Sequence, residues 1–110
     1  MKSYVPHKGD FVIITFDPQS GHEQKGRRPA LVVSNDLFNQ HTGLAVVCPV
    51  THTNRNIPFH VSIEGCGITG YVMVEQMKSI DYGSRGMKFV EKAPAKIINE
   101  VLSLLESCVL

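Results

Sequence analysis

Short runs of β-branched and aromatic residues, separated by turn-forming residues, follow one another along most of this chain. Such runs are typical of β-strands, because these side chains fit a pleated, half-buried surface. Within residues 59–63 apolar and polar side chains alternate, which is the period of a strand with one buried face. The runs predict about six strands, formed by residues 11–16, 30–34, 44–50, 59–63, the adjoining extended segments 71–77 and 78–82, and 87–90.

Helical periodicity marks the C-terminal segment. Pro94 opens it, and apolar side chains at positions 97, 98, 101, 102, 104, 105 and 108 lie on one side of a helix. A short helical turn over residues 37–40 is also predicted, with Ser34, Asn35 and Asp36 as N-cap candidates. Pro49 is expected at a strand end or edge because it donates no backbone hydrogen bond. Thr51 is therefore expected just past the third strand.

Close-set strands followed by one terminal helix favour a mainly β chain of the α+β class. We expect a small, strongly bent sheet or barrel with helical additions, and the order of elements argues against alternating βαβ units. The 110 residues, of which 43% are hydrophobic and 19% charged, suit one domain spanning residues 1–110. The net charge of only +1 excludes a polycation drawn to nucleic acid by bulk charge, so any attraction to phosphate must be local.

The cysteines Cys48, Cys66 and Cys108 are odd in number and have neither C-x-x-C spacing nor a histidine at zinc-ligand spacing. A disulfide framework, a metal centre or another cofactor is therefore not expected. The N-terminal residues carry no export signal, and no apolar run approaches the ~20 residues that span a bilayer. The cytosol is the expected location.

The loop of residues 21–29 has the composition of a phosphate-binding segment. Gly21 and Gly26 permit backbone angles closed to other residues, and Pro29 holds Arg28 extended. Three cations, Lys25, Arg27 and Arg28, stand beside one carboxylate, Glu23. The alternative is a solvated turn whose charges only keep the surface wet.

Two known phosphate-binding fingerprints match this chain incompletely. The loop has the glycine spacing of a P-loop, but Arg27 and Arg28 occupy the positions of Lys and Ser or Thr, and a strand follows where a helix is required. Residues 65–70 read G-x-G-x-x-G, yet another strand-like run comes next. A tight turn between two strands explains this second match better.

Several motifs together carry a resemblance to a known family. They are Gly9-Asp10, Phe16-Asp17-Pro18, the stretch from Gly21 to Ser34, Cys48-Pro49-Val50-Thr51, and Glu75-Gln76-Met77-Lys78-Ser79-Ile80. Their order and spacing, which run through nearly the whole chain up to the final helix, resemble those of the MazF/PemK family of toxin endoribonucleases.

The resemblance implies an SH3-like β-barrel of the MazF/CcdB type with a C-terminal amphipathic helix, assembled as a homodimer. It implies metal-independent, sequence-specific cleavage of single-stranded RNA, in which the ribose 2′-hydroxyl attacks the neighbouring phosphate and leaves a cyclic phosphate and a 5′-hydroxyl. It also implies a partner, a cognate antitoxin whose acidic, partly apolar tail covers the groove.

The family's catalytic arginine and threonine fall on Arg28 and Thr51. A guanidinium offers a planar fork of donors to phosphate oxygens, so charge stabilisation is the expected role of Arg28. Thr51 is expected to donate its hydroxyl hydrogen to a non-bridging oxygen. Glu23 is a candidate general base or an organiser of Arg28, and the alternative is a surface pair with Lys25 or an arginine.

The remaining site candidates are expected to bind RNA, with cations on phosphates and amides on base edges. They are Lys25, Arg27, Asn39, Arg55, Gln76, Lys78 and Arg85. His22 and His52 are interpreted first as loop histidines, although either could serve as the base. His7, His41 and His60 show no partner in the sequence.

Two other functions compete with cleavage. One is a non-enzymatic toxin of the same fold that poisons a topoisomerase, as CcdB proteins do, although such a binder has no need of Arg28 with Thr51. The other is an RNA-binding module that holds phosphate without cutting it.

Overall fold

The computed structural model describes residues 4–15, 27–54 and 56–109, and within them seven strands form one bent antiparallel sheet. The strands are β1 (Asp10–Thr15), β2 (Arg27–Val32), β3 (Leu44–Thr51), β4 (His60–Ile63), β5 (Gly70–Met73), β6 (Lys78–Asp81) and β7 (Lys88–Lys92). The helices are α1 (Asp36–Thr42), the 3₁₀ turn η2 (Val74–Gln76) and α2 (Ala95–Val109). This is a mainly β half-barrel with a terminal helix, so the predicted fold class is confirmed.

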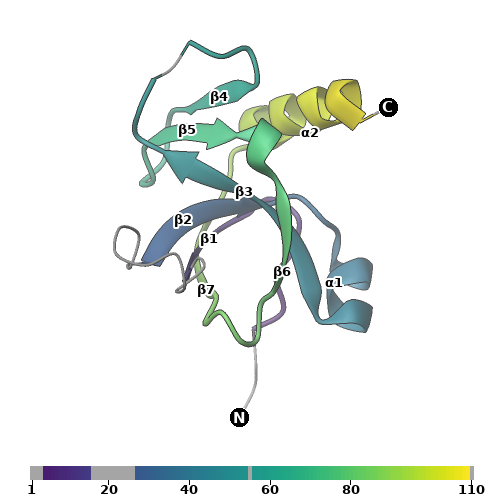
Figure 1. Cartoon of the computed structure of the whole chain (residues 1–110). Coiled ribbons are helices and arrows are strands. Elements are labelled where there is room, and N and C mark those ends of the chain that lie inside the picture. Colours follow the sequence, from purple (N-terminus) through teal and green to yellow (C-terminus); the bar gives the residue numbers. More distant parts are fainter. Residues whose placement is uncertain (1–3, 16–26, 55, 110) are drawn as a thin grey trace, which may run out of the picture.

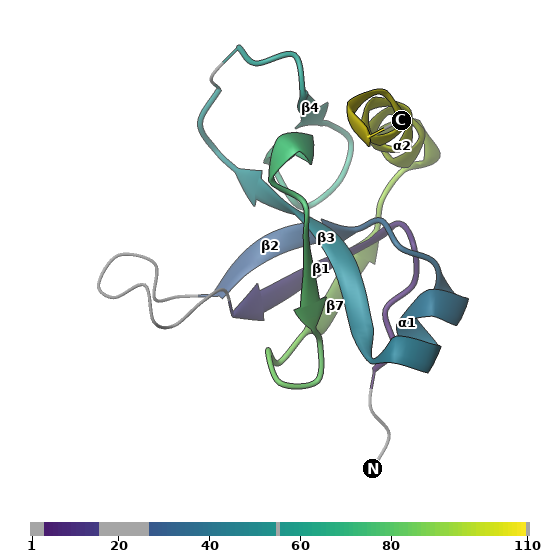
Figure 2. The ribbon, with the colours of Figure 1, turned by 45° about the vertical axis from the view of Figure 1, so that its right-hand side comes forward.

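Strand β3 joins the two parts of the sheet, as Figures 1 and 2 show. The strand order is β4-β5-β3-β2-β1-β7, and β6 also pairs with β3. On one side β3 pairs with β2, with Ala30 opposite Pro49. On its other side, the C-terminal end of β3 pairs with β5, and residues 44–47 pair with β6. The end of β3 therefore lies where the two parts of the sheet meet.

The two faces of the sheet carry separate hydrophobic clusters, because neighbouring strand residues point to opposite faces. One cluster includes Phe11, Leu31, Val72 and, from α2, Ile97 and Val101. The apolar face of α2 is thus buried against the sheet, as its periodicity predicts (Figure 1). The other cluster lies on the opposite face and is formed by Val12, Ile14, Ala30, Val32, Ala45, Val47 and Ile80.

The segment between β5 and β6 differs from the extended conformation predicted for residues 71–77. Val50 of β3 pairs with Val72 of β5, and Val47 of β3 pairs with Lys78 of β6. Three residues along β3 therefore correspond to six residues along the segment that runs from β5 to β6. The three extra residues form the 3₁₀ turn η2, which buries Val74.

Pro49 lies in the same interval, inside β3 and not at its end, at a stretch where one edge of the strand has no ladder partner. The interval suits a residue without an N–H, because the ladder to β5 and β6 is interrupted there. Thr51 is correspondingly the last residue of the strand and does not follow it. The helical turn expected at residues 37–40 is the longer helix α1, capped by the Asn35 side chain.

Candidate active site

Arg28 and Thr51 lie on neighbouring strands at the same level of the sheet. The register of β2 with β3 pairs Ala30 with Pro49, and continuing it by two residues brings Arg28 opposite Thr51. Two residues along a strand return a side chain to the same face, so both side chains lie on the face of Ala30 and Pro49. Residues directly opposite have Cβ atoms about 4.5–5.5 Å apart, close enough for the two side chains to contact one phosphate.

The same two residues line one cavity of about 270 Å³. Its other walls come from the second part of the sheet and the segments beside it. They are formed by Ile57, His60, Met73, Glu75 and Gln76. The structure therefore brings three of the expected site residues, Arg28, Thr51 and Gln76, to one pocket.

The hydroxyl of Thr51 is oriented by the backbone that follows it. Its Oγ1 accepts a hydrogen bond of 3.2 Å from the N–H of Thr53. Accepting this bond uses a lone pair of the oxygen and not its hydrogen. The hydroxyl hydrogen therefore remains available for donation to a ligand.

His60 and Glu75 form a polar pair in this pocket that sequence reasoning missed. Their side chains meet at 2.9 Å between Nε2 and Oε2, and they are 4% and 32% exposed. His60 lies directly opposite Met73 in the β4–β5 ladder, which turns the imidazole towards η2 and Glu75. The prediction of no partner was wrong for His60, and also for His7, whose Nδ1 lies 3.0 Å from Oδ2 of Asp36. The alternation of residues 59–63 predicted that His60 lies on the polar face of its strand. The contact with Glu75 could not be predicted in this way, because it depends on the 3₁₀ turn η2, which brings Glu75 to His60.

The second nitrogen of His60, Nδ1, is buried and has no hydrogen-bond partner among the described residues. An unsatisfied buried polar atom costs about 1–3 kcal/mol of stability. Atoms of this kind are rare in native structures, and a functional role is one physical reason for a protein to keep one.

Arg27 and Arg85 hold the end of β1. Arg27 donates from Nη2 to the carbonyl oxygen of Gly86 at 2.6 Å and from Nη1 to Thr15 Oγ1 at 3.2 Å. Arg85 donates to the carbonyl oxygen of Thr15 at 3.1 Å. Neither lines the pocket of Arg28. Lys78 begins β6, two residues after Gln76, and is exposed.

Asn39 lies inside α1 with a fully buried side chain. Its amide nitrogen donates to the carbonyl oxygens of Pro6 at 2.8 Å and Ser34 at 3.2 Å, and its Oδ1 accepts from the Ser34 hydroxyl. This side chain joins the N-terminal segment to α1. Its burial gives RNA no access to it, so the expected RNA contact of Asn39 is not retained.

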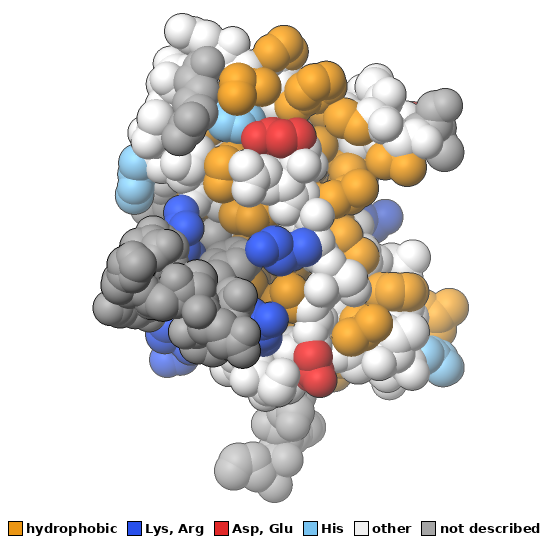
Figure 3. All heavy atoms as spheres, in the orientation of Figure 1, with side chains coloured by type: hydrophobic (Ala, Val, Ile, Leu, Met, Phe, Trp, Pro, Cys, Tyr) orange, Lys and Arg blue, Asp and Glu red, His pale blue; other side chains and the backbone are white. Residues whose placement is uncertain are grey.

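Four further candidates, Glu23, Lys25, Arg55 and His22, lie outside the described residues. Figure 3 shows Lys and Arg side chains gathered around the middle of one face, with an acidic side chain beside a histidine above them. Among the described residues, no group of three or more His, Cys, Asp or Glu side chains could hold a metal ion. The described helices include none of the length and apolarity needed to cross a membrane.

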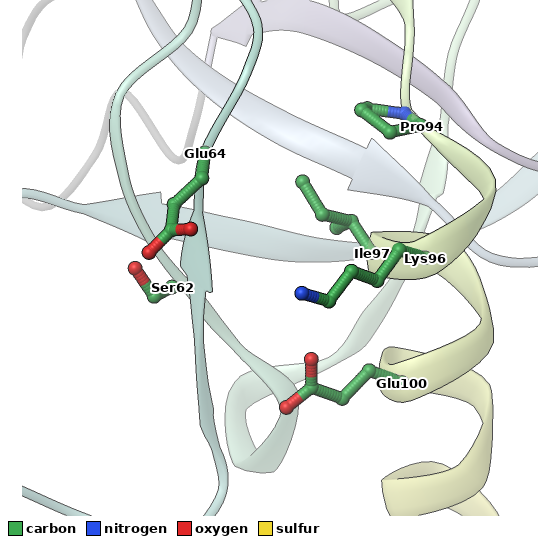
Figure 4. Close-up of a pocket in the computed structure, with 6 residues that line it drawn as sticks. All are labelled: Ser62, Glu64, Pro94, Lys96, Ile97 and Glu100. Carbon is green, nitrogen blue, oxygen red and sulfur yellow. The ribbon is translucent and has the colours of Figure 1, made fainter.

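A second cavity of about 150 Å³ lies between β4 and α2. As Figure 4 shows, Lys96, Ile97 and Glu100 project from the helix towards the side of Ser62 and Glu64, and Pro94 lies at the start of the helix. Two carboxylates and one ammonium line it, so its charge is opposite to that of a phosphate-binding site.

Comparisons with known proteins agree on the class. Residues 7–109 match the family model described as PemK-like, MazF-like toxin of type II toxin-antitoxin system. Endoribonuclease PemK of Escherichia coli is 43% identical over 105 residues, covering 91% of this chain and 79% of the relative. Endoribonuclease toxin ChpB of Escherichia coli (strain K12) is 37% identical over 110 residues, covering 93% and 92%.

Solved structures show the same fold. The crystal structure of MazF (Form-I) from Deinococcus radiodurans has a TM-score of 0.86 at 42% identity, covering 97% of this chain and 98% of that one. The MazE-MazF (Form-II) structure from the same organism has a TM-score of 0.89 at 42% identity, covering 97% of both chains. The fold and pocket define a small half-barrel with a polar cleft lined by Arg28 and Thr51. This chain belongs to the PemK-like, MazF-like toxins of type II toxin-antitoxin systems.

Proposed function

We propose that this endoribonuclease toxin cleaves single-stranded RNA in the pocket of Arg28 and Thr51, without a metal ion. The observation that carries the proposal is the shared cavity, which Arg28 and Thr51 line from two neighbouring strands. A phosphate held there would receive donors from both side chains. The relatives named endoribonuclease support the activity.

The reaction proceeds by attack of the ribose 2′-oxygen on the adjacent phosphorus. The new O–P bond closes a 2′,3′-cyclic phosphate, the bond to the 5′-oxygen breaks, and that oxygen takes up a proton as the leaving 5′-hydroxyl. Charge builds up on the non-bridging oxygens, where preorganised donors act most strongly. Arg28 stabilises that charge, and Thr51 donates its hydroxyl hydrogen to one of these oxygens.

The proton of the attacking 2′-hydroxyl needs an acceptor. Glu23 fills this role or orients Arg28, and both assignments rest on its position in the sequence. Arg28 is a poor proton donor in its own right because a guanidinium stays protonated far above neutral pH. Lys25, Arg27, Arg55, Gln76, Lys78 and Arg85 supply charge and hydrogen bonds along the groove, with Arg27 and Arg85 acting from their positions beside β1.

The natural partner is a cognate antitoxin, since a related toxin from Deinococcus radiodurans is known as a MazE-MazF complex. An acidic segment of that partner would compete with RNA for the cations around the pocket.

The active form is a homodimer in the cytoplasm, where its RNA substrate is found. Light scattering of the purified chain tests the dimer, and a monomer at micromolar concentration would contradict it.

The test of cleavage is incubation of the purified chain with a long single-stranded RNA in EDTA, followed by mapping of the cut ends. Defined cuts that end in cyclic phosphate are expected. Arg28→Ala and Thr51→Ala should lose them while keeping the melting temperature. Lys96→Ala and Thr42→Ala, which change the same kinds of side chain outside the pocket, should cut normally. RNA binding without cleavage would contradict the proposal. A protein that neither binds nor cuts RNA and instead inhibits DNA gyrase would also contradict it.

A further inference from the structure

We propose that Glu75, held in place by His60, selects a base with an exocyclic amino group at a nucleotide flanking the scissile phosphate. Adenine, cytosine and guanine carry such a group, and uracil does not. The inference rests on the proposed function, because it takes Arg28 and Thr51 as the phosphate-binding end of the pocket. It assigns Glu75 a role in specificity and His60 a role as a positioning residue.

The pocket has the parts that a whole nucleotide requires. Arg28 and Thr51 offer donors for a phosphate, whereas Ile57 and Met73 offer apolar surface for the faces of a base. Glu75 and Gln76 line the same cavity and supply polar groups for a base edge. Unstacked bases are recognised in this way in single-stranded RNA, by apolar contact with their faces and hydrogen bonds to their edges.

A carboxylate is an unexpected group in a pocket that binds phosphate, since like charges repel. An ionised carboxylate only accepts hydrogen bonds, so it has nothing to offer a phosphate oxygen. Its favourable contacts in this pocket are with hydrogen-bond donors, and a base edge provides them. Glu75 is therefore matched to the base and not to the backbone of the RNA.

His60 fixes the position of this carboxylate. The imidazole is almost fully buried, and its Nε2 meets Oε2 of Glu75 at 2.9 Å, while the Glu75 side chain stays 32% exposed and open to a ligand. A flexible glutamate loses side-chain entropy on binding a ligand, and a buried partner that holds it beforehand reduces this cost. The unsatisfied Nδ1 of His60 is consistent with a pair kept for recognition and not for stability.

The exocyclic amino groups of adenine, cytosine and guanine each donate to a carboxylate. Uracil presents a carbonyl oxygen at the position where cytosine has its amino group, and this oxygen would face the oxygens of Glu75. A hydrogen bond to a charged acceptor is lost, and two acceptors are brought together. We therefore expect discrimination of about tenfold to a hundredfold against uracil.

The test compares short RNAs that differ only in one amino group at a nucleotide flanking the mapped cut. The two matched pairs are cytidine with uridine and adenosine with purine riboside, placed on each side of the cut in turn. We expect the wild-type kcat/KM to favour the amino-bearing member of at least one pair by about tenfold or more. Equal cleavage within every pair on both sides would overturn the proposal.

Two variants assign the discrimination to Glu75 and His60. Glu75→Gln should bring the kcat/KM ratio between the two matched RNAs close to one, because an amide both donates and accepts hydrogen bonds. His60→Ala should lower the ratio through the loss of positioning, while Glu64→Gln, a carboxylate of the other cavity, should leave it unchanged. If Glu75→Gln slows both members equally and keeps their ratio, Glu75 acts in the chemistry or the fold, and the proposal fails.

Binding measurements separate this inference from the proposed function. RNAs with a 2′-deoxy group at the cut position cannot be cleaved, and their Kd ratios report base selection alone. If the wild-type protein cuts no RNA, the proposed function fails, and Kd ratios for short RNAs that carry each matched pair at every position in turn still decide the inference. If it cuts RNA with equal kcat/KM and equal Kd within each pair, only the inference fails.

Discussion

A Cβ atom added to Gly70 would lie 2.5 Å from the carbonyl oxygen of Thr51 and 3.2 Å from its carbonyl carbon. Gly70 also has a φ of +124°, a conformation that L side chains rarely adopt. The glycine therefore allows β5 to approach the last residue of β3, and this contact positions Thr51 from the side opposite β2.

Gly70→Ala should displace Thr51 and lower RNA cleavage by about tenfold or more, on the order expected for a misplaced catalytic group. The melting temperature should fall as well because the backbone is strained. Gly83→Ala is the matched control, since its added Cβ meets only a side-chain oxygen at 3.5 Å. Normal cleavage by Gly70→Ala would show that Thr51 tolerates the displacement.

Asn39→Ala should destabilise the protein by about 1–3 kcal/mol, because it removes buried hydrogen bonds and leaves the carbonyl oxygen of Pro6 without its donor. Denaturant unfolding measures this change. The variant should cleave RNA normally below its unfolding transition. Reduced cleavage by fully folded Asn39→Ala would restore the RNA-binding role that its burial argues against.

Asp10→Asn should lower the free energy of unfolding by about 2–3 kcal/mol. The buried Asp10 carboxylate accepts hydrogen bonds from the Tyr4 hydroxyl, from the His7 N–H at 3.0 Å and from Lys92 Nζ at 2.6 Å. It thereby joins the N-terminal segment to β7. Asp36→Asn, which affects an exposed pair with His7, should change stability little. Equal losses in the two variants would contradict this account.

Stability should fall as the pH rises above 9, and Cys48 should account for part of the slope. Burial raises the pKa of this thiol from 9.0 to about 12. Between these values the unfolded chain loses the proton and the folded chain keeps it, so unfolding becomes easier by up to about 1.4 kcal/mol per pH unit.

The measurement is urea unfolding between pH 8 and pH 10, below the range in which the Tyr4 hydroxyl, whose pKa is also raised by burial, contributes. Cys48→Ala should have a shallower slope than wild type, whatever its absolute stability. Cys108→Ala removes an exposed thiol and should keep the wild-type slope. Parallel slopes for wild type and Cys48→Ala would contradict the assignment.

The sequence allowed the strands and the last helix to be predicted because each depends on a local pattern. The alternation in residues 59–63 and the apolar positions of α2 report which face is buried, and the structure buries or half-buries those positions, with Phe59 and Cys108 as the exceptions. The resemblance supplied Arg28 and Thr51, which the structure brings to one cavity.

Non-local geometry explains what was missed. The contact of His60 with Glu75 depends on the offset between β5 and β6 along β3, which no local pattern reveals. Asn39 was assigned to RNA because its amide could contact a base edge, yet its side chain is buried and three hydrogen bonds compensate for that burial. The hydrogen bonds of Arg27 and Arg85 to backbone carbonyl oxygens were missed as well, since these carbonyls come from distant segments.

The most direct test of the shared phosphate is a double-mutant cycle on single-turnover cleavage with Arg28→Ala, Thr51→Ala and the double variant. Side chains that act on one phosphate are strongly coupled, so the double variant should lose far less than the product of the two single losses. A loss equal to that product would mean that Arg28 and Thr51 act independently, and it would contradict the mechanism.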